Sequence, residues 1–255
     1  MPPVSHGRRS VARAPFALCV ALLLSGAAAA PAADYMRVAD GGEIIRYTSF
    51  DDFIANANGF VEGTVAGYGN DAGFFYDFDR ESYFRVDDAG NVLEYPTLPD
   101  LTSNSNALVQ GSVATYGNDS GFFHDPVRQS YFRIGNSGGI LEYATFGEFI
   151  TNTITVNHGF QGRYSGNAGL FFDPDRGSYF RVDFGGVVFE YATSIDFLGD
   201  TNGTSLVQHV TYGNDAGFFA LPEAPSPVPL GSAFLTGLAL LGASIGALGT
   251  RRGSS

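Results

Sequence analysis

The chain has 255 residues, one cysteine, no tryptophan and a formal net charge of −12. All 26 acidic residues lie between Asp34 and Glu223, where they face nine arginines, so this part of the chain carries a net charge of −17. A surface this acidic repels phosphate backbones, which excludes nucleic acid as a natural partner. Solubility in a salty exterior explains the acidity, and binding of cations is the alternative.

Residues 1–32 are typical of a secretory signal peptide. A basic stretch at Arg8-Arg9 and Arg13 precedes an apolar run from Ala14 to Leu24, and Ala30-Pro31-Ala32 offers small residues where signal peptidase cuts. Cleavage after Ala32 would remove Cys19, so no disulfide could staple the body that follows. Sec and twin-arginine export both remain open.

A pentapeptide returns three times at an unbroken interval of 48 residues. The copies are Asp34-Tyr35-Met36-Arg37-Val38, Ser82-Tyr83-Phe84-Arg85-Val86, Ser130-Tyr131-Phe132-Arg133-Ile134 and Ser178-Tyr179-Phe180-Arg181-Val182. A second marker begins at Tyr68, Tyr116, Tyr164 and Tyr212 with the same spacing. A unit of this size must stack on copies of itself, so residues 33–221 are predicted to form a fourfold repeat.

The second copy predicts four short antiparallel strands. They are expected at Leu108–Tyr116, Gly121–His124, Ser130–Ile134 and Ile140–Tyr143. The segment Asp125-Pro126-Val127-Arg128 suits a tight β-turn between the second and third of these strands.

A hydroxyl residue follows the fourth strand of every unit, with an acid three residues later. These pairs are Ser49 with Asp52, Thr97 with Asp100, Thr145 with Glu148 and Thr193 with Asp196. The pattern approximates a capping box and predicts one short helix per repeat. The helix would hold Phe53, Leu101, Phe149 or Phe197 over the edge of the sheet.

Strand alternation predicts a cross-strand ion pair between Arg85 and Glu94, repeated as Arg133 with Glu142 and Arg181 with Glu190. Such pairs help to set strand register. In the first unit Arg46 takes the place of the glutamate, opposite Arg37, and a nearby acid such as Asp40 or Glu43 is expected to compensate.

The repeat begins with a third strand and ends with a second, which leaves a half-unit at each end, Asp34 to Tyr47 and Leu206 to Phe219. If the units are arranged radially, the two halves complete one sheet and no unpaired edge remains. The fold class is therefore predicted to be all-β, a four-bladed β-propeller closed by its N- and C-terminal strands. An open stack of units is the alternative.

The Tyr-Phe-Arg strand, the size of the repeat and the short terminal helix resemble hemopexin-type repeats. The similarity covers Asp34 to about Phe219, without the tryptophan usual in that strand and without a disulfide between the first and last blades. It implies a binding module, and in some members cations in the central channel.

The candidate metal ligands are Asp71, Asp119, Asn167 and Asp215, which the repeat places at one end of the ring. Oxygen ligands that converge on an axis suit Ca²⁺. Ordinary turn chemistry explains the same Asn-Asp pairs. His124, His158 and His209 occupy different repeat positions and form no symmetric ligand set, and His158 and Arg163 break the repeat in the third unit. No nucleophile elbow, HExxH or phosphate loop occurs, so no enzymatic activity is predicted.

The C-terminal region changes composition to a proline-rich linker at 222–229 and an apolar segment at 230–255, which is long enough for a transmembrane helix. Val228, Pro229 and Leu230, the apolar run and the pair Arg251 and Arg252 resemble PEP-CTERM sorting tails of the Val-Pro-Leu-Pro type. Gly231 replaces the second proline. The resemblance implies an exosortase-type processing enzyme as a partner, and an ordinary membrane anchor is the alternative.

Together these features predict an exported bacterial protein of the cell surface or extracellular matrix. It would be held at the cytoplasmic membrane at least transiently, and would act as a non-enzymatic binding or structural module. Two alternatives remain. One is a Ca²⁺-stabilised module that binds extracellular polysaccharide, and the other is a secreted hydrolase.

Overall fold

The computed structural model describes residues 33–68, 73–118, 121–154, 156–165, 169–214 and 217–222, all of which belong to one compact unit. The predicted signal peptide, the apolar segment at 230–255 and all of the linker except Pro222 lie outside these residues. Among the described residues, no helix is both long enough and apolar enough to cross a bilayer.

The body consists of four antiparallel sheets of four strands each. The first contains β16 (Gly217–Ala220), β1 (Tyr35–Val38), β2 (Glu43–Tyr47) and β3 (Phe60–Thr64). The second contains β4 (Gly73–Asp77), β5 (Ser82–Val86), β6 (Asn91–Tyr95) and β7 (Leu108–Ser112). The third contains β8 (Gly121–Asp125), β9 (Ser130–Ile134), β10 (Gly139–Tyr143) and β11 (Val156–Phe160). The fourth contains β12 (Gly169–Asp173), β13 (Ser178–Val182), β14 (Val187–Tyr191) and β15 (Thr204–Gln208).

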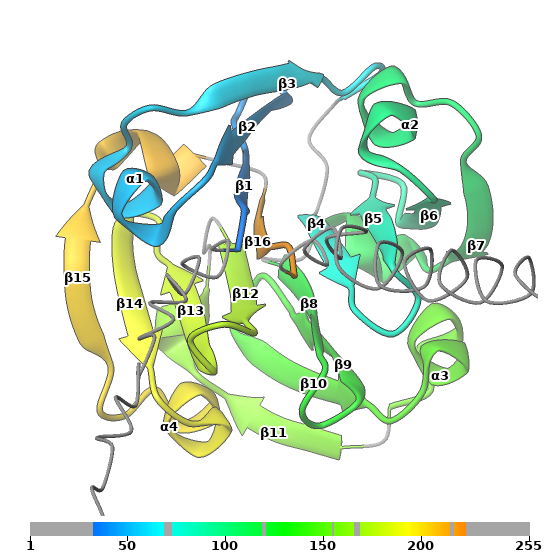
Figure 1. The fold of residues 1–255 in the computed structure, drawn as a ribbon. Coiled ribbons are helices and arrows are strands. Elements are labelled where there is room, and N and C mark those ends of the chain that lie inside the picture. The colour runs from blue at the N-terminus through cyan, green and yellow to red at the C-terminus, as the bar shows by residue number, and fades with distance from the viewer. Residues whose placement is uncertain are drawn as a thin grey trace, which may run out of the picture. The chain divides into compact units, whose positions relative to one another are not determined.

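The inner strand of each sheet contacts the inner strands of both neighbouring sheets. The contacts run from β4 to β8, from β8 to β12, from β12 to β16 and from β16 back to β4. Figure 1 shows these four strands around the centre, with β3, β7, β11 and β15 at the rim. The fold is therefore an all-β, four-bladed propeller, as the repeat predicts.

The ring closes through an antiparallel pair between β1 and β16. Met36 lies opposite Phe219, and Val38 lies opposite Gly217. The predicted C-terminal half-unit, Leu206 to Phe219, was wrong in its extent, because Leu206 lies in β15, the outermost strand of the fourth blade. The first blade instead combines three N-terminal strands with one C-terminal strand. In the same way, the strand at Leu108 does not share a blade with the strand at Gly121. It is β7 of the second blade, where it pairs with β6.

The axis between the inner strands is filled by side chains. At one level, each blade contributes a glycine followed by a large apolar residue, namely Gly73-Phe74, Gly121-Phe122, Gly169-Leu170 and Gly217-Phe218. A Cβ atom at Gly169 would lie 2.4 Å from the ring of Phe218, so the glycine makes room for the ring of the next blade. A cavity of about 10 Å³ remains further along the axis, between rings that include Phe75, Phe123 and Phe171. That is about the space of one water molecule.

Each predicted capping pair begins a six-residue helix, at α1 (Phe50–Ala55), α2 (Leu98–Ser103), α3 (Phe146–Thr151) and α4 (Ser194–Gly199). The reciprocal capping box is complete at Thr145 and Glu148. Phe149 on α3 is fully buried, as are its equivalents on the other helices, Phe53, Leu101 and Phe197. This confirms the prediction that each helix holds an apolar side chain against the sheet.

A glycine in each β-hairpin turn lies directly against the segment that leads to the next blade. Gly138 has a φ of +91°, and a Cβ atom there would lie 2.2 Å from the carbonyl oxygen of Gln161. The N–H of Gln161 donates to the carbonyl of Gly138 at 2.9 Å. The following segments form short 3-10 helices, η1 (Ala114–Asn118), η2 (Gly162–Tyr164) and η3 (Val210–Asn214). The first replaces the last part of the strand expected at Leu108–Tyr116.

The predicted pairing of Arg85 with Glu94 was wrong. Arg85 lies opposite Leu93, and Glu94 lies opposite Phe84. Glu94 instead receives a bidentate ion pair from Arg80, at 2.8 and 3.1 Å. The same arrangement recurs as Arg128 with Glu142 and Arg176 with Glu190.

The arginines of the Tyr-Phe-Arg strands, which are buried or half-buried, contact the segments between blades. Arg85 donates to the carbonyl oxygen of Gly67, and the guanidinium of Arg133 lies 4.7 Å from the centre of the Tyr116 ring. In the first blade Arg46 lies opposite Met36. Its compensating acids are Glu62 and Asp34, at 2.6 and 3.4 Å, and not the predicted Asp40 or Glu43.

Candidate functional site

The predicted calcium ligands Asp71, Asp119, Asn167 and Asp215 lie outside the described residues, so the calcium site stays a prediction. Within the described ranges, no group of three or more His, Cys, Asp or Glu side chains is placed to hold a metal ion. Three arrangements of charged side chains are candidates for a functional site: the turns after β4, β8 and β12, the contacts of Glu142, and one cleft beside Arg163.

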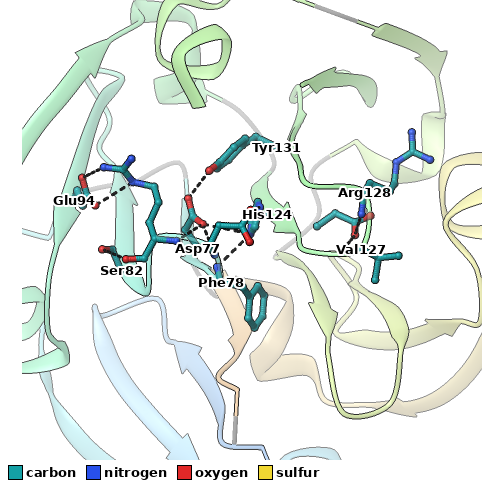
Figure 2. A network of polar contacts seen from close by, with 11 residues as sticks. Asp77, Phe78, Ser82, Glu94, His124, Val127, Arg128 and Tyr131 are labelled. Carbon is teal, nitrogen blue, oxygen red and sulfur yellow. Dashed lines mark hydrogen bonds and ion pairs between the residues drawn. The ribbon is translucent and has the colours of Figure 1, made fainter. Parts of the chain in front are cut away.

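Asp77 ends the inner strand β4 and connects two blades. Its Oδ1 accepts hydrogen bonds from the backbone N–H groups of Asp79 and Arg80, at 3.0 and 3.1 Å. Its Oδ2 accepts the hydroxyl proton of Tyr131, from β9 of the next blade, at 2.6 Å. Figure 2 shows the Tyr131 hydroxyl directed at Asp77. Burial and this hydrogen bond raise the pKa of Tyr131 far above its ordinary value.

The same aspartate–tyrosine bond occurs at two further junctions between blades. Asp125 accepts from Tyr179 at 2.7 Å, and Asp173 accepts from Tyr35 at 2.6 Å. At the fourth junction the repeat places Leu221 where the acid would be, and Tyr83 is the corresponding tyrosine. Burial raises the pKa of Tyr83 to about 12. The bond therefore connects neighbouring blades at three of the four junctions.

His124 is the one inner-strand residue of this network that can change charge near neutral pH. Its Nδ1 accepts from the backbone N–H of Phe78 at 3.2 Å, so the neutral ring carries its proton on Nε2, which lies 3.4 Å from Asp79 Oδ2. Burial lowers the pKa of His124, although the neighbouring carboxylates, Asp77 first, act in the opposite direction. His124 is thus a neutral, structural histidine beside Asp77 (Figure 2).

Glu142 lies at the centre of a group of charged contacts in the third blade. It accepts from Arg128 at 2.8 Å and contacts His158 Nε2 at 2.7 Å. Burial alone would raise the pKa of Glu142, but the hydrogen bonds from Arg128 and His158 outweigh it and the net shift is downward. The repeat-breaking His158 is therefore a partner of Glu142. His209 has a different role, because its Nε2 lies 2.7 Å from the carbonyl oxygen of Ile54.

The tyrosines of the second sequence marker also connect blades, a role that their spacing alone does not reveal. The hydroxyl of Tyr116 donates to the carbonyl of Phe149 on α3 at 2.5 Å, and the hydroxyl of Tyr212 donates to the carbonyl of Phe53 on α1 at 2.6 Å. Tyr164 makes the equivalent bond to Phe197. The invariant spacing of these tyrosines is the signal that could have indicated a shared structural role.

An open cleft of about 360 Å³ lies where η2 meets the β13–β14 hairpin. We call it the Arg163–Phe184 cleft. Its lining residues are Gly162, Arg163, Ser165, Arg181, Asp183, Phe184, Gly185 and Phe189. The side chain of Arg163 is 77% exposed and Phe184 is 71% exposed. The guanidinium of the buried Arg181 lies 4.3 Å from the centre of the Phe189 ring.

The cleft depends on two residues that differ from their repeat equivalents. Arg163 stands where the other repeats have Gly67, Thr115 and Thr211. Phe184 stands where they have Asp40, Asp88 and Asn136. The rest of the cleft follows the repeat more closely, with Arg181 matching Arg37, Arg85 and Arg133. The exposed cation and the exposed ring are therefore specific to this junction.

The sequence matches no protein-family model and no curated protein. Among solved structures, a chain from work on the de novo evolutionary emergence of a symmetrical protein, shaped by folding constraints, is 16% identical with a TM-score of 0.43, over 71% of this chain and 76% of that chain. The WD40 β-propeller domain of Doa1 is 12% identical with a TM-score of 0.32, and the match covers 74% of this chain and 54% of that domain. The propeller fold is assigned from the strand pairing and from the contacts between inner strands.

Proposed function

We propose that this protein is an exported, non-enzymatic binding or structural module of the cell surface or extracellular matrix. The observation that carries the proposal is how its buried ionisable groups are used. Asp77, Asp125 and Asp173 each bind a tyrosine of another blade, and Glu142 binds Arg128 and His158. Groups held in such bonds stabilise a rigid body, which leaves the loops and the Arg163–Phe184 cleft as the surfaces for partners.

The export part of the proposal is supported by the two ends of the sequence. The basic and apolar pattern of residues 1–32 favours secretion. The proline-rich linker, Val228-Pro229-Leu230 and Arg251-Arg252 favour recognition by an exosortase-type enzyme and transfer of the body to the surface. The absence of cysteine from residues 33–255 suits a body that is stable without disulfides.

Fractionation of host cells followed by mass spectrometry of the mature protein tests this proposal. We expect the protein in the surface or extracellular fraction, with an N-terminus near residue 33. A C-terminus within or just after 222–229 would support processing of the tail, whereas an intact tail in the membrane fraction would support a simple anchor. A full-length chain that is soluble in the cytoplasm would contradict the proposal.

The second candidate is a module that binds extracellular polysaccharide and is stabilised by Ca²⁺. The exposed ring and cation of the Arg163–Phe184 cleft favour the binding part. The calcium part depends on Asp71, Asp119, Asn167 and Asp215, and is tested by the melting temperature with Ca²⁺ and with a chelator. A ligand bound only by the native state raises the melting temperature, so equal melting in the two conditions would remove calcium from the account.

A further inference from the structure

We propose that the Arg163–Phe184 cleft binds an uncharged sugar residue of a polysaccharide chain. This inference rests on the proposed function as a binding module and names the ligand class of one surface. Three features of the cleft support it: an exposed aromatic ring, a polar donor and acceptor beside that ring, and a balance of charge.

The aromatic feature is Phe184, at the tip of the β13–β14 hairpin. A phenylalanine that is 71% exposed contributes little to the stability of its own chain. Its repeat equivalents Asp40, Asp88 and Asn136 show that the turn itself needs no aromatic residue. A pyranose ring presents one face of C–H groups, and such a face packs on an aromatic ring while its hydroxyls stay outward. Phe184 is thus placed as a platform for a sugar.

The polar feature is the pair Arg163 and Asp183 beside that ring. Within the described residues, the side chain of Arg163 makes one contact, from Nε to Asp200 Oδ2 at 3.5 Å, which leaves the terminal N–H groups of this cleft-lining residue as donors for a ligand. Asp183 uses Oδ1 to accept from the N–H of Val187 at 2.9 Å, and its Oδ2 makes no hydrogen bond to the described part of the chain. Each sugar hydroxyl can donate and accept a hydrogen bond, so a donor beside an acceptor suits two adjacent hydroxyls.

The charge of the cleft selects against ionic ligands. Arg163 and Arg181 are matched by Asp183 and Asp200, and the guanidinium of Arg181 is already bonded to the carbonyl oxygen of Arg163 and to Asp200. An anionic ligand would approach a body of net charge −17 and find no surplus positive charge. A cation would meet two arginines. A neutral, hydroxyl-rich ligand avoids both penalties.

Saturation-transfer NMR on the full-length chain tests the proposal with three probes: cellotetraose, mannotetraose and a tetramer of galacturonic acid. The variants are Phe184→Asn and Arg163→Thr, which install the residues of sister repeats at two exposed positions. Phe60→Ala is the matched control, because Phe60 is a 61% exposed phenylalanine on the first blade. We expect saturation of at least one neutral probe, at least about tenfold weaker binding in Phe184→Asn and in Arg163→Thr, and unchanged binding in Phe60→Ala.

Three results would overturn the proposal: no saturation of either neutral probe, binding of the uronate alone, or equal affinity in the wild type and both cleft variants. Thermal melting of each variant separates lost binding from lost folding, since both cleft positions are exposed. The test uses purified protein, so its outcome is independent of cellular location. A cytoplasmic location would contradict the proposed function while leaving the cleft result in place.

Discussion

At the residue scale, one carboxylate performs two structural tasks. The Oδ1 of Asp77 fixes the turn that follows β4, and its Oδ2 receives the hydroxyl of Tyr131 from the next blade. The bond from Tyr131 is buried, and a buried acceptor that loses its donor incurs the full cost of its desolvation. The bond therefore connects local turn geometry to the packing of two blades.

Removal of the Tyr131 hydroxyl measures this bond. We expect Tyr131→Phe to lower the free energy of unfolding by roughly 1–3 kcal/mol, because Asp77 Oδ2 would be left without its partner. The internal control is Tyr83→Phe, at the junction where Leu221 replaces the acid, where we expect a change below about 0.5 kcal/mol. Urea unfolding followed by circular dichroism gives both values. Equal losses in the two variants would show that the hydroxyls do not act through the aspartate.

At the element scale, the sequence predicted the kinds of element better than their partners. The repeat, the capping pairs and the strand at Ser130–Ile134 are all present as expected. The predicted pairing of Arg85 with Glu94 was wrong because the turn after Val86 places Val92 opposite Val86. Arg85 and Glu94 therefore lie on opposite faces of the sheet. A shift of one residue in the pairing register moves every side chain of a strand to the other face of the sheet. The sequence pattern does not determine which of the two registers forms.

The strand at Leu108 shows the second limit of sequence reasoning. It is followed by Gly121 after a short segment, so proximity along the chain favoured pairing it with the strand that comes next. In the structure it follows α2 and pairs back with β6, the strand before that helix, with a register shift between Val92 and Leu93. The sequence predicted the Arg163–Phe184 cleft only in part, for a similar reason. Arg163 was recognised as a break in the repeat, but its approach to Phe184 depends on how two successive blades pack.

The hairpin glycine provides a test at this scale. Gly138→Ala is expected to destabilise the protein by roughly 2–4 kcal/mol, since the backbone there is left-handed and the new Cβ would overlap the carbonyl of Gln161. Its neighbour Gly139 is the matched control, because a Cβ atom at Gly139 has nothing within 4 Å. Thermal unfolding of the two variants measures the difference in stability between them. A loss for Gly139→Ala as large as that for Gly138→Ala would contradict the close approach.

At the scale of the whole molecule, the body is held together by buried tyrosines that bridge neighbouring blades or elements. Burial is the first cause of the raised pKa of seven tyrosines, and hydrogen bonds to aspartates add to it at several of them. Their positions are Tyr35, Tyr76, Tyr83, Tyr131, Tyr164, Tyr179 and Tyr191. A phenol whose native pKa is raised contributes stability that is fully present below the unfolded pKa of 10.0 and is lost progressively as the pH rises from there towards the native pKa.

The protein is therefore expected to unfold cooperatively in alkali. Stability should be constant with respect to these groups below pH 10.0 and fall above it, by about 1.4 kcal/mol per pH unit for each tyrosine whose native pKa is higher still. Ultraviolet absorbance of tyrosinate and circular dichroism, recorded on the same samples, test this, and the absence of tryptophan simplifies the absorbance. Gradual ionisation of all 13 tyrosines near pH 10.0 with an unchanged dichroism spectrum would contradict the buried network.

The closed ring is the claim on which the blade junctions, the filled axis and the placement of the cleft all depend. Amide hydrogen exchange on the full-length chain, resolved by mass spectrometry, tests it at the β1–β16 pair. We expect residues 35–38 and 217–220 to be protected as strongly as the β4–β5 pair, because both segments are bonded within one sheet. Rapid exchange in both terminal segments, with β4 and β5 still protected, would show that the ring is open.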